Sequence, residues 1–235
     1  MDKIDVLIPL KDDSKINYLD LIYTLRSIEK HLKNYGTIYI VGKVPKSIKN
    51  VVEIPFKELR NEDYRQSNIV NKTIFCLEQI KENNILFFND EHFLLTDFNA
   101  LTFPNYQDGE IEPVHGNDYR YTQQKTLMYL KEHNLPTVNF DVHTPIIYNK
   151  EKFLSIFKDL KFDRFGYCIK SIYGNSLGLK GTYMDDCKIR HKVTYEHAKE
   201  ICRDKKIVSC NDSALKTGLG EYLSELFPIK SIYEN

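Results

Sequence analysis

The stretch NILFFNDEHFLL, residues 84–95, guides the interpretation of the whole chain. An apolar run, ILFF (85–88), is followed by NDEH (89–92) and then by a second apolar run, FLL (93–95). A short apolar run bounded by polar residues is typical of a buried β-strand. Two carboxylates and an imidazole therefore come directly after a predicted strand, between two segments that have the composition of a protein core.

Predicted strands and helices alternate upstream of this stretch. The predicted strands are IDVLI (4–8), TIYIVG (37–42), NVVEI (50–54) and ILFF (85–88), and apolar residues spaced by three and four predict helices within 16–36 and 67–84. Short connections between alternating elements indicate an open α/β sheet with crossover helices. We therefore predict an α/β fold, in which helices flank an open mixed sheet.

The second half of the chain is less regular. An extended segment with turns is expected over 98–116, a helix over 118–134, a strand over 137–149, and helices within 150–160 and 167–175. No internal repeat, low-complexity run or linker interrupts the sequence. We predict a single domain over 1–235, with a first half over 1–97 and a second half over 98–235.

The composition excludes several classes of protein. Lys plus Arg and Asp plus Glu both number 33, which removes the simplest argument for non-specific nucleic-acid binding, a basic excess, and leaves a local basic patch as the alternative. No window is apolar over 18 residues, so no membrane span is expected, and the segment 1–10 lacks the features of a signal peptide. Five scattered Cys without a C-x-x-C pair predict a reduced, cytoplasmic protein and argue against a Cys-based zinc site.

Ligands in open α/β sheets bind outside the carboxyl ends of the strands, which makes Asp90 and Glu91 the first candidate site. Carboxylate oxygens suit Mn²⁺ or Mg²⁺, and such a cation stabilises a diphosphate leaving group. The alternative is an exposed turn with incidental charges. We predict that Asp90 and Glu91 bind the metal.

A second candidate group, which would bind a nucleotide, lies after the first strand and at the second long helix. Its members are Pro9, Lys11, Asp12, Asp13, Arg65 and Asn68, with Lys72 one helical turn further on. Asp accepts hydrogen bonds from a base or ribose, while Lys, Arg and a helix N-terminus bind phosphate. A simple helix N-cap or a solvated helix start explains the same residues. Neither G-x-G-x-x-G nor a P-loop motif occurs, which disfavours both of those nucleotide-binding classes.

Candidate catalytic residues come from the second half. In NFDVHTP (139–145), Asp141 and His143 are two residues apart and would share one face of the predicted strand. His serves as a general base, a metal ligand or a donor to a phosphoryl oxygen, although a single His is also common as a structural residue. Asp186, in YMDDCKIRH (183–191), and Lys170 are further candidates, with a surface loop and a helix face as the alternatives.

Several of these segments resemble known families. IDVLIPLKDD (4–13) resembles the opening strand and nucleotide loop of glycosyltransferases with the GT-A fold, and FFNDEHFLL (87–95) lies where their acidic metal motif would be. Blocks at 21–51, 87–95 and 140–175 are also similar, in the same order, to the Stealth family of sugar-phosphate transferases. The resemblance covers roughly 1–100 and 138–178, and it implies a GT-A-like fold with a donor-binding first half and an acceptor-side second half.

The resemblance also implies roles for single residues. Asp12 and Asp13 would face the nucleotide or metal, Asp90 with Glu91 would hold the cation, and His143 would act at the reacting centre. Lys170 would contact the diphosphate where the Stealth pattern has Arg, and it lacks the bidentate geometry of Arg. Glu91 stands in place of Asp. IPLKDDS (8–14) replaces the Stealth opening and is closer to ordinary glycosyltransferases.

Together these features predict a metal-dependent glycosyltransferase that moves a sugar from a nucleotide-diphosphate sugar to an acceptor hydroxyl. Asp141, His143 or Asp186 would deprotonate the acceptor, which is a glycan or another polymer, with a modified nucleic-acid base among the open choices. Transfer of a sugar-1-phosphate, as in the Stealth family, is the first alternative. A non-catalytic nucleotide- or carbohydrate-binding module is the second.

Overall fold

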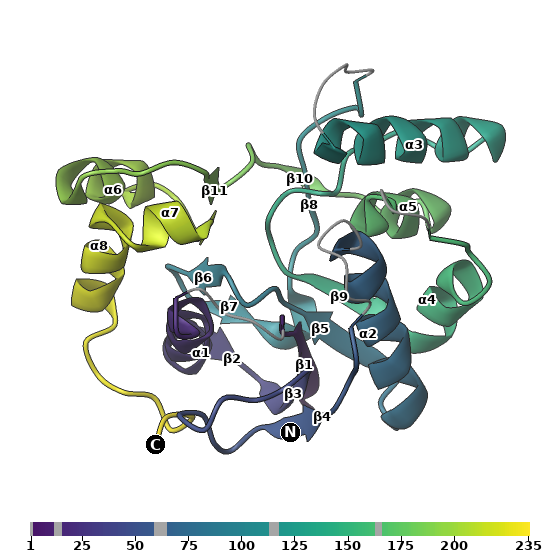
Figure 1. Ribbon diagram of the computed structural model, residues 1–235. Helices are drawn as coiled ribbons and strands as arrows, with labels where there is room; N and C mark the ends of the chain where they lie inside the picture. Colours follow the sequence, from purple (N-terminus) through teal and green to yellow (C-terminus); the bar gives the residue numbers. More distant parts are fainter. Residues whose placement is uncertain (1, 12–15, 59–64, 113–117, 163–165) are drawn as a thin grey trace.

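The computed structural model describes residues 2–11, 16–58, 65–112, 118–162 and 166–235 (Figure 1). Its helices are α1 (Leu19–His31), α2 (Arg65–Gln79), α3 (Asp118–Glu132), α4 (Lys150–Phe157), α5 (Ile169–Ser176), α6 (Tyr195–Cys202), α7 (Asp212–Leu215), α8 (Gly218–Leu226) and a short 3-10 helix, η2 (Ala100–Thr102). None of the helices in these ranges combines the length and apolar character that crossing a membrane requires.

The main sheet has the strand order β4-β3-β1-β5-β9. Its strands are β1 (Ile4–Pro9), β3 (Tyr35–Val41), β4 (Val52–Ile54), β5 (Asn84–Phe87) and β9 (Ile146–Asn149). The four strands from the first half are parallel, and β9 pairs antiparallel with β5. The prediction of an open mixed α/β sheet is confirmed. The carboxyl ends of β1, β3, β4 and β5 consequently meet at one edge.

The two faces of the main sheet are covered by different helices, as Figure 1 shows. Successive side chains of a strand point to opposite faces, so Val6 and Ile8 pack with Leu25 of α1, whereas Leu7 packs with residues of α2, α4 and α5. All residues of β1 are buried. A strand that is covered on both faces needs a nearly continuous apolar run, and IDVLIP is apolar except for Asp5, whose Oδ1 accepts a hydrogen bond from the N–H of Thr37.

Shorter strands extend the fold beyond the main sheet. β11 (Lys188–Ile189), β12 (Ile207–Cys210) and β6 (His92–Leu94) form a sheet of order β11-β12-β6, in which β12 is antiparallel to β6. The short pairs β2 (Leu32–Lys33) with β7 (Phe98–Asn99) and β8 (Tyr106–Gln107) with β10 (Thr182–Tyr183) are parallel. Helices α6, α7 and α8 pack on the β11-β12-β6 sheet through a core of their own.

A bidentate ion pair ties α1 to a segment that is distant in sequence. The Nε and Nη2 atoms of Arg26 each donate to a carboxylate oxygen of Glu234 at 2.7 Å, and Nη1 donates to the carbonyl of Phe227 at 2.7 Å. Parallel donation by a guanidinium is the strongest geometry for such a pair. The segment after α8 is thereby fixed against α1.

The predicted strand over 137–149 is wrong for most of its length, because only Ile146–Asn149 forms one. The preceding backbone bonds to side chains of α5 instead. Ser171 Oγ accepts from the N–H of Phe140 at 3.0 Å, and Asn175 Oδ1 accepts from the N–H of Val138 at 3.1 Å. Side chains that satisfy the backbone in this way replace a strand ladder. Asp141 and His143 therefore do not share a strand face.

A glycine of α5 allows this irregular segment to pack closely. A Cβ atom added at Gly174 would lie 2.5 Å from Cδ2 of the buried Phe140 ring. We expect Gly174→Ala to lower the free energy of unfolding by roughly 1–3 kcal/mol, the usual cost of overpacking a core. Ser176→Ala in the same helix, which adds no atoms, should be close to neutral. Urea denaturation measures both, and equal stability of Gly174→Ala and the wild type would contradict the close contact.

Candidate functional site

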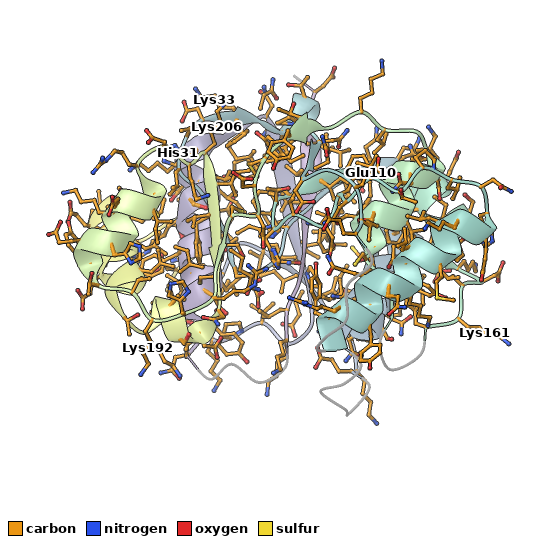
Figure 2. The ribbon with its side chains drawn as sticks, turned by 90° about the horizontal axis from the view of Figure 1, so that it is seen from above. His31, Lys33, Glu110, Lys161, Lys192 and Lys206 are labelled. Carbon is orange, nitrogen blue, oxygen red and sulfur yellow. The ribbon has the colours of Figure 1, made fainter. Side chains whose placement is uncertain are left out.

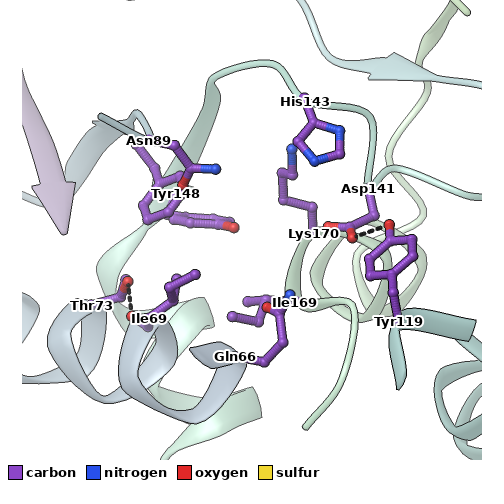
Figure 3. A pocket seen from close by; sticks show the side chains of 11 residues that line it. Gln66, Ile69, Thr73, Asn89, Tyr119, Asp141, His143, Tyr148, Ile169 and Lys170 are labelled. Carbon is purple, nitrogen blue, oxygen red and sulfur yellow. Dashed lines mark hydrogen bonds between the residues drawn. The ribbon is translucent and has the colours of Figure 1, made fainter. Parts of the chain in front are cut away.

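A small cavity opens at the edge where β5 ends and β9 begins (Figure 3). Helices α2, α3 and α5 contribute to its wall, together with residues just after β5 and just before β9. Asn89, Asp141, His143 and Lys170 supply polar groups, and its volume of about 70 Å³ accommodates roughly two water molecules or one small reacting group. Side chains that are distant in sequence therefore converge at the edge predicted to bind a ligand.

His143 is held in one orientation by Asp186. Nδ1 of His143 lies 2.8 Å from Oδ1 of Asp186, and Arg190 pairs with the other carboxylate oxygen. Burial opposes ionisation of Asp186, but the hydrogen bonds from His143 and Arg190 outweigh it and hold the pKa of this carboxyl below its usual range. An ionised carboxylate only accepts hydrogen bonds, so Nδ1 carries a proton, and Nε2 is the ring nitrogen that can accept one.

Lys170 supports the same histidine through the backbone. Its buried ammonium donates to the carbonyls of Val142 and Thr144, the residues on either side of His143, the second at 3.1 Å. Burial lowers the pKa of Lys170, against the charges of Asp141 and other groups nearby. In Figure 3 the Lys170 side chain extends toward His143. The observed contacts fix the loop that carries His143, and contact of Lys170 with a diphosphate stays a prediction.

Asp141 lies on the wall of the cavity and is held by a tyrosine of α3. The hydroxyl of Tyr119 donates to Oδ2 of Asp141 at 2.8 Å, a contact visible in Figure 3. Burial and the neighbouring Asp141 carboxylate raise the pKa of Tyr119 well above its usual value. Tyr119 therefore stays protonated and donates. The structure brings Asp141, His143, Lys170 and Asp186, the four predicted catalytic residues, into one region.

Buried hydroxyl groups of α1 hold the acidic turn, residues 89–91, in place. The hydroxyl of Thr24 lies 2.8 Å from the carbonyl of Asp90 and 3.2 Å from that of His92, and Ser27 Oγ accepts from the N–H of Leu94 at 3.1 Å. Burial, followed by the charges of Asp20 and Glu91, raises the pKa of Asp90 well above its usual value. The carboxylates of the turn are therefore crowded and partly dehydrated.

Asp20, in the first turn of α1, belongs to the same group of carboxylates. Burial raises its pKa to about 6, against the hydrogen bond from the N–H of Leu21, and the charges of Glu91 and Asp212 add to the rise. Among the residues that the structure describes, however, no group of three or more His, Cys, Asp or Glu side chains is arranged to hold a metal ion. The carboxylate of Glu91 is occupied by an ion pair with Lys188.

The described residues thus do not by themselves fit a bound divalent cation at Asp90 and Glu91. The expected Mn²⁺ or Mg²⁺ stays a prediction. Asp12 and Asp13, which the family resemblance places near the nucleotide or metal, lie outside the described residues, as does the side chain of Arg65.

The remaining predicted nucleotide-binding residues occupy the expected elements. Pro9 is the buried last residue of β1, Lys11 is exposed just after it, and Asn68 is buried on α2. From α2, Gln66 and Thr73 reach the cavity wall. Nucleotide binding by Pro9, Lys11 and Asn68 stays a prediction.

Lys72 has a structural role, which its position in the sequence indicates. It lies on the buried face of α2, and its ammonium donates to the carbonyl of Leu10 and pairs with Glu58. A lysine inside an apolar helical stripe, four residues before Cys76, signals a buried ammonium that needs acceptors. Tyr119 and Lys188 gave no such local signal, because their partners are 22 and 97 residues away.

His92 is fully buried and closes the acidic turn. Its Nδ1 accepts from the N–H of Asn89 at 3.1 Å, so the proton of the neutral ring is on Nε2. Burial lowers the pKa of His92 well below its usual value, and the charges of Lys170, His143 and Lys188 act in the same direction. The imidazole therefore stays neutral and acts here as a hydrogen-bond acceptor for the turn.

The low pKa of Asp186 predicts a pH-dependent contribution to stability. We expect Asp186→Asn to lower the free energy of unfolding near pH 7 by on the order of 1–2 kcal/mol, because the paired carboxylate is lost. Because its pKa is depressed, the Asp186 carboxylate stabilises the folded state at pH values above its unfolded pKa of about 3.9. The difference in free energy of unfolding between the wild type and Asp186→Asn should therefore shrink as the pH falls below about 4. Urea denaturation across that pH range measures it, with the exposed neighbour Asp185→Asn as control. An equal loss near pH 3 would contradict the ion pair.

Comparisons with known proteins find a distant structural likeness. No protein-family model matches the sequence, and no curated protein matches it. Among solved structures, the chain is similar to mouse xyloside xylosyltransferase 1 in its apo form, at 11% identity and a TM-score of 0.45. The likeness covers 90% of this chain and 98% of that chain. At this distance it says nothing about activity.

Proposed function

We propose that this protein is a glycosyltransferase that transfers a sugar from a nucleotide-diphosphate sugar to an acceptor hydroxyl. One observation carries the proposal: Asn89, His143 and Lys170, which are distant in sequence, line one cavity at the carboxyl edge of a parallel sheet. Ligands of open α/β folds bind at that edge. Ile69 and Tyr148 add apolar surface beside these polar groups.

His143 is the residue best placed to accept the proton of the acceptor. Its Nδ1 is committed to Asp186, so Nε2 is the basic atom. When Nε2 takes the hydroxyl proton, the resulting imidazolium is stabilised by the Asp186 carboxylate, which Arg190 holds in place. Lys170 fixes the backbone on both sides of this histidine. The arrangement supplies a general base whose orientation is set before the substrate binds.

The bond changes follow from this assignment. The acceptor oxygen forms a bond to the anomeric carbon, and the bond between that carbon and the phosphate oxygen breaks. The electron pair leaves with the nucleoside diphosphate, and the proton stays on His143 until solvent removes it. The acceptor is a hydroxyl of a glycan or another polymer in this proposal.

Transfer of a sugar-1-phosphate is the second candidate reaction, and the position of two residues favours it. His143 and Lys170 both belong to the block at 140–175 that resembles the Stealth family, and both line the cavity. In this version the acceptor attacks the phosphorus next to the sugar, and a nucleoside monophosphate leaves. The same histidine would serve as base.

Replacement of His143 tests its role. We expect His143→Gln to lower kcat by roughly 10²–10⁴-fold, the usual contribution of a general base, with little change in KM for the donor. The exposed His191→Gln is a matched control and should behave like the wild type. The measurement is steady-state turnover with the nucleotide sugar found by thermal-shift screening. An unchanged kcat in His143→Gln would assign His143 a structural role.

The released nucleotide distinguishes the two transfer reactions. We expect chromatography of the reaction mixture to show a nucleoside diphosphate, because the proposed attack is at the anomeric carbon. Release of a nucleoside monophosphate would instead establish sugar-phosphate transfer. Donor binding without any turnover, including slow hydrolysis, would contradict both reactions and leave a binding module.

A further inference from the structure

We propose that Lys188 is the resident counter-cation of the acidic turn, meaning that its ammonium occupies the place at Glu91 that a divalent metal would otherwise take. The acidic turn comprises residues 89–91. This inference concerns the charge of the turn and holds whether or not the protein transfers a sugar. It accounts for an acidic motif that the described residues do not complete as a metal site.

The contacts at Glu91 are the first part of the argument. The Lys188 ammonium pairs with Oε1 of Glu91, and the hydroxyl of Ser209 lies 3.4 Å from the same oxygen. The side chains of Lys188 and Glu91 are 18% and 22% exposed, and Ser209 is fully buried. The pair is therefore shielded from solvent on most sides, where an ion pair is screened less than at the surface.

The backbone fixes Lys188 at this position. In the β11-β12-β6 sheet, Lys188 is opposite Ser209, and Ser209 is opposite His92, the residue directly after the acidic turn. Cross-strand neighbours present their side chains on the same face, so the ammonium and the hydroxyl both meet the turn. Cys187 and Ile189, on either side of Lys188 in the chain, are both buried.

Hydrogen bonds within residues 186–190 also hold the backbone of Lys188 in place. The N–H of Lys188 donates to Oδ1 of Asp186 at 3.3 Å, and Arg190 Nη1 donates to the carbonyl of Lys188 at 3.2 Å. Asp186 also binds His143. One short segment thus places the partner of His143 and the partner of Glu91 two residues apart, and it links the cavity to the acidic turn.

The charge balance explains why an ammonium is needed there. Asp90, Asp20 and Glu91 act on one another electrostatically, and Lys188 is the positive group acting on Asp90 in that cluster. Removing one partner of a shielded ion pair leaves an uncompensated charge, which is strongly unfavourable. A lysine ammonium is a compact cation with three donors and no acceptor, so it neutralises carboxylates without offering a metal ligand. A divalent cation at Glu91 would compete with Lys188 for Oε1 of this carboxylate.

Binding of Mn²⁺ to the full chain, without any substrate, tests this inference. Electron paramagnetic resonance should show weak binding to the wild type and at least roughly ten-fold tighter binding to Lys188→Met, a change of about 1.4 kcal/mol. Lys206→Met, which removes the same charge from the exposed lysine labelled in Figure 2, should behave like the wild type. Equal Mn²⁺ affinity of the wild type and Lys188→Met would overturn the proposal.

The tighter Mn²⁺ binding of Lys188→Met must also depend on Glu91. We expect Glu91→Gln to abolish the gain when it is added to Lys188→Met, and persistence of tight binding in the double variant would assign the site elsewhere. If Lys188→Met does not fold, as judged by circular dichroism, Lys188→Gln replaces it in the same titration.

A chemical measurement on the wild type needs no lysine variant. Acetic anhydride followed by mass spectrometry should modify Lys188 several-fold more slowly than Lys206, and Glu91→Gln should accelerate the modification of Lys188. Equal rates for Lys188 and Lys206 would overturn the proposal. Because neither measurement uses a donor sugar, failure here is distinct from failure of the proposed transferase activity.

Discussion

The position of β1 between β3 and β5 is the constraint on which the rest of the structure depends. Hydrogen bonds continue past the strand ends, from the N–H of Leu10 to the carbonyl of Val41 and from the N–H of Phe88 to that of Leu7, both at 2.9 Å. Gly42 permits the tight approach there, since its φ is 136° and a Cβ would lie 2.5 Å from the Leu10 carbonyl. The three chain segments leave the sheet together, which brings their polar continuations to one edge.

Three lysine ammonium groups, two of them buried, bind groups around that edge. Lys72 binds the carbonyl that follows β1, Lys170 binds the carbonyls that flank His143, and Lys188 binds Glu91. Each ammonium donates to backbone or carboxylate oxygens that are shielded from much of the solvent. These lysines act between elements rather than within one, so each joins two parts of the chain that local structure alone would leave independent.

The elements of the main sheet could be predicted because their signals are local. Apolar runs such as 4–8 and the helical spacing in 16–36 are set by the faces that each element buries. The strand predicted over 137–149 is wrong before Ile146, because the backbone partners of this part, Ser171 and Asn175, belong to a later helix. The candidate catalytic residues could be predicted from residue type and strand ends. The pairing of Glu91 with Lys188 could not, because it depends on the register of a sheet formed by three distant segments.

The pairing of Arg26 with Glu234 has a consequence for the order of events during synthesis. The two residues are 208 positions apart, so α1 is made long before its bidentate partner exists. Contacts of such high sequence separation form late and slow the completion of a fold. On the ribosome, the apolar face of α1 can pack against β1 and β3 early, whereas its guanidinium stays hydrated until the segment around residue 234 emerges. The core cluster that contains Leu25 of α1 also contains Tyr233, so the same late segment completes both the ion pair and this part of the core.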